Sequence, residues 1–210
     1  THLSVAYTLH SIGLLELAQD RYAEAISIFD RAIDIARQRL PPEHPHLATM
    51  LSSIARAHMN SGDSAAALAM YERAAEVSEL SSSSDASIQA NMAVVLLRMH
   101  RYEEALAASE AAAAVFETQH EYGRSDLIPT LVNVALAKKG LGDLVGADEV
   151  LRRVVDAAGD SSKVDLNVRA AVHATLAELK LARGQLDVAL EQAEQGARLL
   201  GQGPGGNRKV

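Results

Sequence analysis

Histidine carries the most versatile chemistry in this sequence, which has eight histidines and no cysteine. A metal site needs several ligands at short spacing, as in an HExxH helix or a cluster of histidines and carboxylates. Neither pattern occurs: His44 and His46 flank a proline, and the other histidines fall in separate parts of the chain. Without cysteine the chain also lacks disulfides, thiolate nucleophiles and thiolate metal ligands. We therefore predict no metal site and no cofactor.

One glycine-rich stretch, residues 140–146, resembles a phosphate-binding loop. Such loops follow a β-strand, whereas this stretch follows a segment with helical periodicity. Glu103 and Glu104 are acids that could take part in proton transfer, but they fall at the start of a helical pattern, where the helix dipole favours acidic residues. We predict no catalytic residue and no enzymatic activity.

A third kind of chemistry is hydrogen bonding by a small polar side chain that recurs at intervals of 42, 38, 42 and 42 residues. The five positions are Ser11, Ser53, Asn91, Asn133 and Thr175. Amides and hydroxyls can both donate and accept hydrogen bonds, so these side chains could bind the backbone of a partner. Alternatively, they occupy a solvated helix face on which Ser and Thr bond back to their own helix.

Small residues recur in the sequence at the same intervals. They indicate which helices position the polar side chains. An alanine follows each predicted turn of the chain. These alanines, called the anchor alanines below, are Ala25, Ala67, Ala105, Ala147 and Ala189. Twelve residues earlier stand Gly13, Ala55, Ala93, Ala135 and Ala177. Small residues at fixed positions allow two helices to pack closely. Apolar residues on both sides of each turn follow helical spacing, so we predict two antiparallel helices per repeat.

Five such repeats account for nearly the whole chain. We expect a single array over residues 1–200, with repeats at about 3–40, 45–80, 85–120, 126–159 and 164–200, and a flexible glycine-rich tail at 201–210. Prolines at 41 and 42 and serines at 81–84 separate repeats, and Pro129 is expected in the first turn of a helix. Residue 1 falls at a repeat boundary, so we expect a fragment of a longer protein.

The composition of the chain limits the classes of partner that it is expected to bind. The chain has 210 residues and a formal net charge of −7, with no dense block of lysine and arginine that would neutralise phosphates. No apolar run approaches the roughly 20 residues that span a bilayer. We therefore expect neither nucleic acid nor a membrane as a partner, and we expect a cytoplasmic protein.

The repeat unit resembles the tetratricopeptide repeat (TPR). Its 42-residue spacing, together with the sequence His44-Pro45-His46-Leu47-Ala48 before a first helix, is similar to the longer variant of kinesin light chains and many bacterial signalling proteins. The resemblance implies an all-α, right-handed superhelical TPR solenoid of five helix-turn-helix repeats, with about ten helices.

In similar arrays the first helices line a concave groove that binds a protein or an extended peptide, and Asn91 and Asn133 match asparagines that bond the peptide backbone. The resemblance places nine further residues in this groove: Tyr7, His10, Leu14, Arg56, Val94, Arg98, Leu136, Lys139 and Glu178. The cations among them suit an acidic partner, or serve only for solubility. The carboxylate clamp of some TPR domains is not expected, because His10 and Leu14 replace its Lys and Asn.

The resemblance favours a protein-binding or peptide-binding scaffold or adaptor, as a fragment of a larger signalling protein. One alternative is an intramolecular sensor that regulates an appended kinase, ATPase or DNA-binding domain. Another is end-to-end self-association, because the ends of a repeat array expose apolar side chains. The residues concerned are Leu3, Leu14, Leu190, Leu199 and Leu200.

Overall fold

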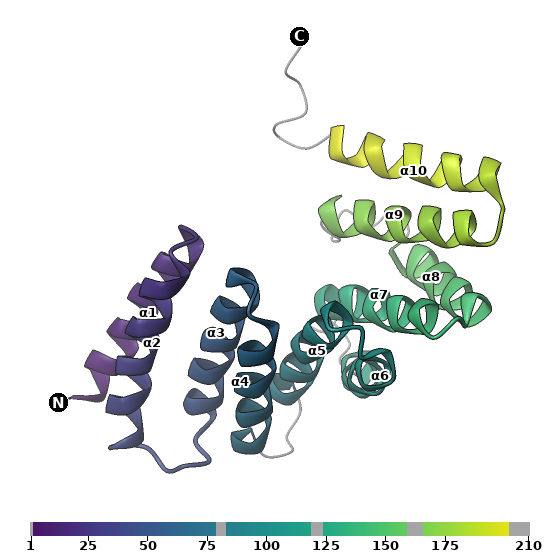
Figure 1. Ribbon diagram of the computed structural model, residues 1–210. Coiled ribbons are helices and arrows are strands. Elements are labelled where there is room, and N and C mark those ends of the chain that lie inside the picture. The colour runs from purple at the N-terminus through teal and green to yellow at the C-terminus, as the bar shows by residue number, and fades with distance from the viewer. Residues whose placement is uncertain (1, 79–82, 119–123, 159–165, 202–210) are drawn as a thin grey trace, which may run out of the picture. The chain divides into compact units, whose positions relative to one another are not determined.

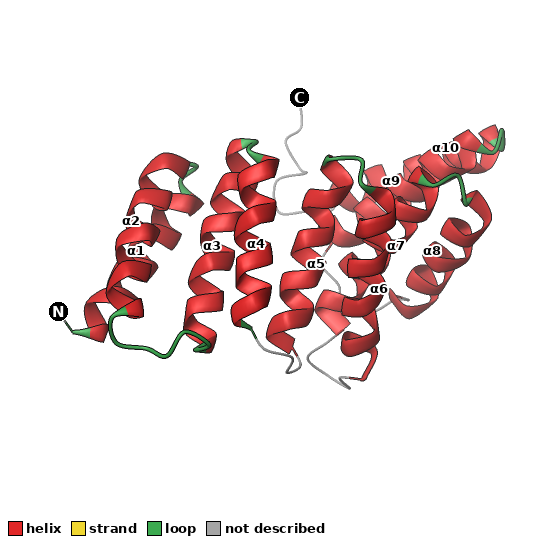
Figure 2. Ribbon diagram, turned by 60° about the horizontal axis from the view of Figure 1, so that its bottom comes forward, coloured by secondary structure: helices red, strands yellow, loops and turns green. Residues whose placement is uncertain are grey.

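The computed structural model describes residues 2–78, 83–118, 124–158 and 166–201. Every regular element in these ranges is an α-helix, and there are ten of them (Figures 1 and 2). They are α1 (Leu3–Ala18), α2 (Tyr22–Arg37), α3 (Pro45–Ser61), α4 (Ser64–Val77), α5 (Ser83–Arg98), α6 (Tyr102–Thr118), α7 (Arg124–Gly140), α8 (Leu144–Ala158), α9 (Leu166–Ala182) and α10 (Leu186–Gly201). The prediction of an all-α fold with about ten helices is confirmed.

The helices belong to two compact units, Thr1–Arg101 and Tyr102–Val210. In the first unit α1 packs on α2 and α3 on α4, while α2–α3 and α4–α5 contacts join successive repeats. In the second unit α6, α7, α8, α9 and α10 pack in chain order, and α7 also contacts α9. The helices are numbered so that an odd-numbered helix precedes the short turn of each repeat, and the odd-numbered helices are called the first helices below. The prediction of one array over 1–200 stays a prediction.

The turn inside each repeat depends on one residue with a left-handed backbone. Gly62, Gly142 and Gly184 have φ values of 92°, 84° and 72°, while Asp20 and His100 adopt 59° and 58°. Glycine adopts this conformation without the steric cost that a Cβ atom brings. These turns therefore end the first helix of each pair.

The glycines of residues 140–146 serve the fourth of these turns. Gly140 ends α7 against the ring of Tyr102, where a Cβ atom would clash with the ring carbons. Asp143 accepts a hydrogen bond from the backbone N–H of Gly146 at 2.9 Å and so caps α8. A Cβ atom on Gly146 would collide with that same carboxylate. The stretch that resembles a phosphate-binding loop is thus a helix-to-helix turn.

The small residues predicted at helix crossings are buried, except for Ala177, which is half-buried. Ala25, Ala67 and Ala105 are fully inaccessible, and Gly13 packs beneath the ring of Phe29. Larger apolar side chains complete the cores of each unit: Leu17, Phe29 and Ile54 in the first, and Leu131, Leu151, Val154, Leu176 and Leu179 in the second. Close helix contact at the small residues lets these larger side chains interlock.

One predicted detail, the place of Pro129, is wrong. Pro129 was expected in the first turn of a helix, but it lies inside α7, because that helix begins at Arg124. At the other end of the chain, α10 extends to Gly201, the first residue of the predicted tail. The rest of that tail, residues 202–210, lies outside the described residues.

Candidate functional site

The five small polar residues all lie on first helices, but the hydroxyls of three of them already donate a hydrogen bond within their own helix. Ser11, Ser53 and Thr175 donate to the backbone carbonyl four residues earlier, at 3.0, 3.1 and 2.9 Å. This is the local alternative that the sequence left open for Ser and Thr. Ser53 and Thr175 are also buried, with 7% and 8% of their surface exposed. These hydroxyls keep only acceptor capacity for a partner.

The two asparagines differ in accessibility. Asn91 on α5 is exposed, whereas Asn133 on α7 is half-buried. An exposed amide keeps both its donors and its acceptor for a ligand. Asn91, which belongs to the first unit, is therefore the more accessible member of the pair.

In the first unit, α1 contacts α3 and α3 contacts α5, so the first helices form a continuous surface. Four of its side chains lie together between α1 and α3. The rings of Tyr7 and His46 meet edge to face with centroids 5.0 Å apart, and His10 Nε2 lies 2.9 Å from Ser53 Oγ. The His10 ring also lies beside Phe29 of α2, with centroids 5.4 Å apart. We name the group Tyr7, His10, His46 and Arg56 the α1–α3 histidine site.

His46 was not among the predicted site residues, and its neighbour His44 has a structural task. His44 Nδ1 accepts a hydrogen bond from the backbone N–H of His46 at 3.2 Å, so His44 caps α3. The two imidazole rings stack with centroids 5.1 Å apart. His46 follows Pro45, the first residue of α3, and this position on the first turn is the signal that could have placed it beside α1.

Arg56 gives the α1–α3 histidine site its positive charge. Its side chain is exposed and makes no ion pair within the described part of the chain. Burial lowers the pKa of His10 below its usual 6.5, and the nearby charges of Arg56 and His46 lower it further. This environment favours the neutral form of His10, beside a guanidinium that has no ion pair among the described residues.

The other two cations among the predicted site residues already bind groups within the protein. Arg98 Nη1 donates to the carbonyl oxygen of Met59 at 2.9 Å. Lys139 forms an ion pair with Glu178, with Nζ and Oε2 2.6 Å apart. Glu178 is itself a predicted site residue, so the structure brings these two together, and the charge of Lys139 is neutralised.

The three apolar site residues lie at the edges of the cores. Leu14, Val94 and Leu136 are all half-buried. Leu14 packs against the first core and Leu136 against the second. They can offer a partner only the part of each side chain that remains accessible.

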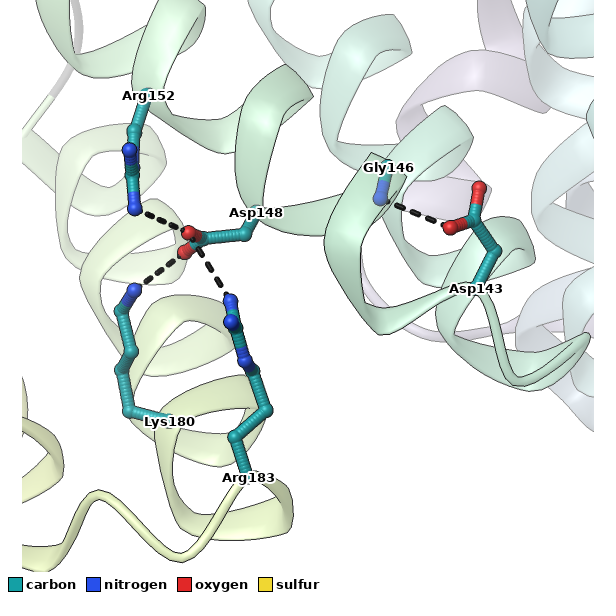
Figure 3. A network of polar contacts seen from close by, with 6 residues as sticks. All are labelled: Asp143, Gly146, Asp148, Arg152, Lys180 and Arg183. Atoms are coloured by element: carbon teal, nitrogen blue, oxygen red, sulfur yellow. Dashed lines mark hydrogen bonds and ion pairs between the residues drawn. The ribbon is translucent and has the colours of Figure 1, made fainter.

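Sequence reasoning missed an ion cluster around Asp148 in the second unit (Figure 3). This carboxylate is only 2% exposed and lies 2.5 Å from Lys180 Nζ, 2.6 Å from Arg152 Nη2 and 3.2 Å from Arg183 Nη1. Burial alone would raise the pKa of Asp148, but the hydrogen bond from Lys180 and the three positive charges outweigh burial and lower it. The cluster joins α8 to the C-terminal end of α9.

A comparison between repeats could have found this cluster. Asp148 directly follows the anchor alanine of its repeat, where the other four repeats have an apolar residue: Ile26, Leu68, Leu106 and Leu190. An acid at an otherwise apolar position signals a buried partner of opposite charge.

The described residues hold neither a cluster of metal ligands nor a membrane-spanning helix. No group of three or more histidine, aspartate or glutamate side chains converges as a set of metal ligands there. Among the described helices, none is long and apolar enough to cross a bilayer.

Solved structures share this fold across almost the entire chain. Nearly identical TPR-like repeats of a kinesin light chain from Podosopora anserina are 22% identical, with a TM-score of 0.80, over 96% of this chain and 97% of that chain. BtubC (BKLC) from P. vanneervenii is 18% identical with a TM-score of 0.79, over 99% and 86%. A Rap protein complexed with competence and sporulation factor is 18% identical with a TM-score of 0.74, over 95% and 54%.

At these identities the structural likeness shows the fold alone, and no curated protein matches the chain. The family is shown by sequence. A model described as tetratricopeptide repeat matches residues 4–79 and 84–160, which together make up well over half of the chain. The resemblance carried by the repeated small residues is therefore confirmed, and the chain belongs to the tetratricopeptide repeat family.

Proposed function

We propose that this chain is a scaffold that binds a protein or an extended peptide through the surface of its first helices. The observation that carries the proposal is the continuous contact of α1, α3 and α5, on which exposed polar side chains recur from repeat to repeat. Ser11, Arg56 and Asn91 supply such side chains from three successive first helices. A strand-like ligand running across these helices would meet a polar group at each repeat.

The chemistry of this surface suits recognition of a peptide backbone. The Asn91 amide can donate to a peptide carbonyl and accept from a peptide N–H, whatever the side chains of the ligand. Tyr7 and Arg56 are residue types that carry much of the binding energy in protein interfaces. The Rap protein with a similar fold, solved in complex with competence and sporulation factor, is consistent with a binding role for this architecture.

Within this proposal the scaffold belongs to a larger signalling protein, where it recruits a partner or regulates an appended domain. Self-association is a second candidate, favoured by the apolar surface of α10. Leu190 and Leu200 on that helix are 63% and 57% exposed. Exposed apolar side chains on one helix can form a contact between molecules.

The proposal is tested by selecting peptides from a displayed random library on the immobilised chain. The same selection is made on an Asn91→Ala/Asn133→Ala variant and on a Ser27→Ala control, whose changed residue is exposed on α2. We expect peptides enriched by the parent and by Ser27→Ala to be lost from the asparagine variant, with helicity checked by circular dichroism. Equal enrichment on all three proteins would show that the peptides bind a surface that does not include the asparagines.

A further inference from the structure

The α1–α3 histidine site combines features that point to the chemistry of the ligand. Arg56 is an exposed cation without an ion pair in the described part of the chain, although the protein as a whole carries a net charge of −7. The site therefore offers a positive charge that an incoming anion can pair with.

The groups that face His10 add to this positive character. On α1 itself the neighbouring site residue is Tyr7, and α2 presents the uncharged ring of Phe29. The charged or titratable groups of α3 that act on His10 are Arg56 and His46, and His46 is stacked on His44. Each of these groups is neutral or cationic below pH 7, so an anion bound here meets no carboxylate among them.

Hydrogen bonding leaves one nitrogen of His10 available for a proton. Ser53 uses its hydroxyl hydrogen on the carbonyl of Thr49, so Ser53 Oγ is the acceptor of the bond to His10. His10 then donates from Nε2, at 2.9 Å. In the neutral ring the other nitrogen, Nδ1, is the basic atom, and it has no hydrogen-bond partner within the described residues. Protonation at Nδ1 therefore leaves the bond to Ser53 intact.

We propose that the α1–α3 histidine site binds an acidic side chain of the partner peptide and that His10 takes up a proton when it does so. This inference rests on the proposed peptide-binding function and names the ligand chemistry at one place on that surface. A carboxylate beside Arg56 offsets the positive charge that disfavours a charged imidazole. Binding therefore tightens as the pH falls from about 8 to about 6, where peptide carboxylates are still ionised.

The experiment uses two random peptide pools that differ only in glutamate or glutamine at one fixed position. Binding of each pool to the immobilised full chain is measured at about pH 8 and about pH 6. We expect the glutamate pool to bind about tenfold more tightly than the glutamine pool at the lower pH, with a smaller difference at the higher pH. Equal binding of the two pools at both pH values overturns the inference but leaves the proposed function standing. Binding of neither pool overturns both.

Variants assign the effect to the two residues. Arg56→Gln is expected to lose the preference for glutamate, whereas Arg73→Gln on α4, which removes the same charge, keeps it. His10→Gln is expected to lose the pH dependence, whereas His58→Gln, whose ring lies near Asp63, keeps it. An unchanged pH dependence in His10→Gln contradicts the proton uptake.

A further measurement uses the parent chain alone, so its result does not depend on whether a variant folds. The pKa of His10 is measured from its imidazole NMR signals in the parent, first alone and then with each pool. We expect the glutamate pool to raise that pKa and the glutamine pool to leave it unchanged. Equal His10 titration curves in all three samples overturn the inference.

Discussion

At the scale of single residues, the clearest departure from the repeat pattern is a buried charge. Asp148 occupies a position that is apolar in the other repeats, yet it is surrounded by Lys180, Arg152 and Arg183. Removing one partner of a buried ion pair leaves the other charge without compensation, whereas replacing both by apolar residues is often neutral. The cluster therefore makes the contact between α8 and α9 depend on matching charges.

The first prediction concerns this pair. Asp148→Leu should lower the free energy of unfolding by about 2–4 kcal/mol, because Lys180 would remain nearly buried beside an apolar side chain. Adding Lys180→Leu should recover most of the loss. Urea denaturation of the full chain, followed by circular dichroism, measures both. If the free energy of unfolding of Asp148→Leu lies within about 0.5 kcal/mol of that of the parent, the cluster contributes nothing to stability.

The second prediction is the pH dependence of the same cluster. The pKa of Asp148 is lower in the folded chain than its usual 3.8, so the folded state binds fewer protons there than the unfolded state. Its contribution to stability is therefore present above pH 3.8 and is lost as the pH falls through the lower folded pKa. Acid titrations should show a smaller loss in the Asp148→Leu/Lys180→Leu variant than in the parent. Identical acid transitions would contradict this.

Some of the residue-scale features were predictable and others were not. The bonds of Ser11, Ser53 and Thr175 to their own helices follow from local geometry, and the sequence offered them as one alternative. The contact between His10 and Ser53 spans 43 residues and depends on how α1 crosses α3. No pattern within either helix contains that information.

At the scale of elements, the recurrent small residues determine which helices pack. Ala67 is fully buried on α4, whereas Ala69 on the same helix is exposed. Helix type and number could be predicted because the apolar spacing and the turn residues agree in all five repeats. The start of α7 could not, because serine and aspartate are good N-caps and also tolerable residues in a first turn.

The third prediction tests the packing of these small residues. Ala67→Leu should overpack the contact around α4 and lower the free energy of unfolding by about 1–3 kcal/mol. Ala69→Leu adds the same side chain to the exposed face and should change it by less than about 0.5 kcal/mol. Urea denaturation of the two variants makes the comparison. If both lie within about 0.3 kcal/mol of the parent, Ala67 is not a packing constraint.

At the scale of the whole molecule, fold and function differ in how far a sequence determines them. The fold follows from a pattern repeated five times, so errors in one repeat are corrected by the others. The partner depends on a few exposed side chains that vary from repeat to repeat, and TPR arrays of similar fold serve as scaffolds for different ligands. Accordingly the family was predictable from the sequence, whereas the ligand chemistry could be proposed only from the environment of Arg56 and His10 in the structure.

The most direct test of the central claim is a map of the surface that a selected peptide contacts. Backbone amide NMR signals of the full chain are recorded with and without a peptide enriched by the library selection. We predict that the shifted signals belong to the first helices, with the largest changes on α1, α3 and α5. Shifts concentrated on the second helices, such as α2, α4 and α10, would contradict the claim that the first helices bind the partner.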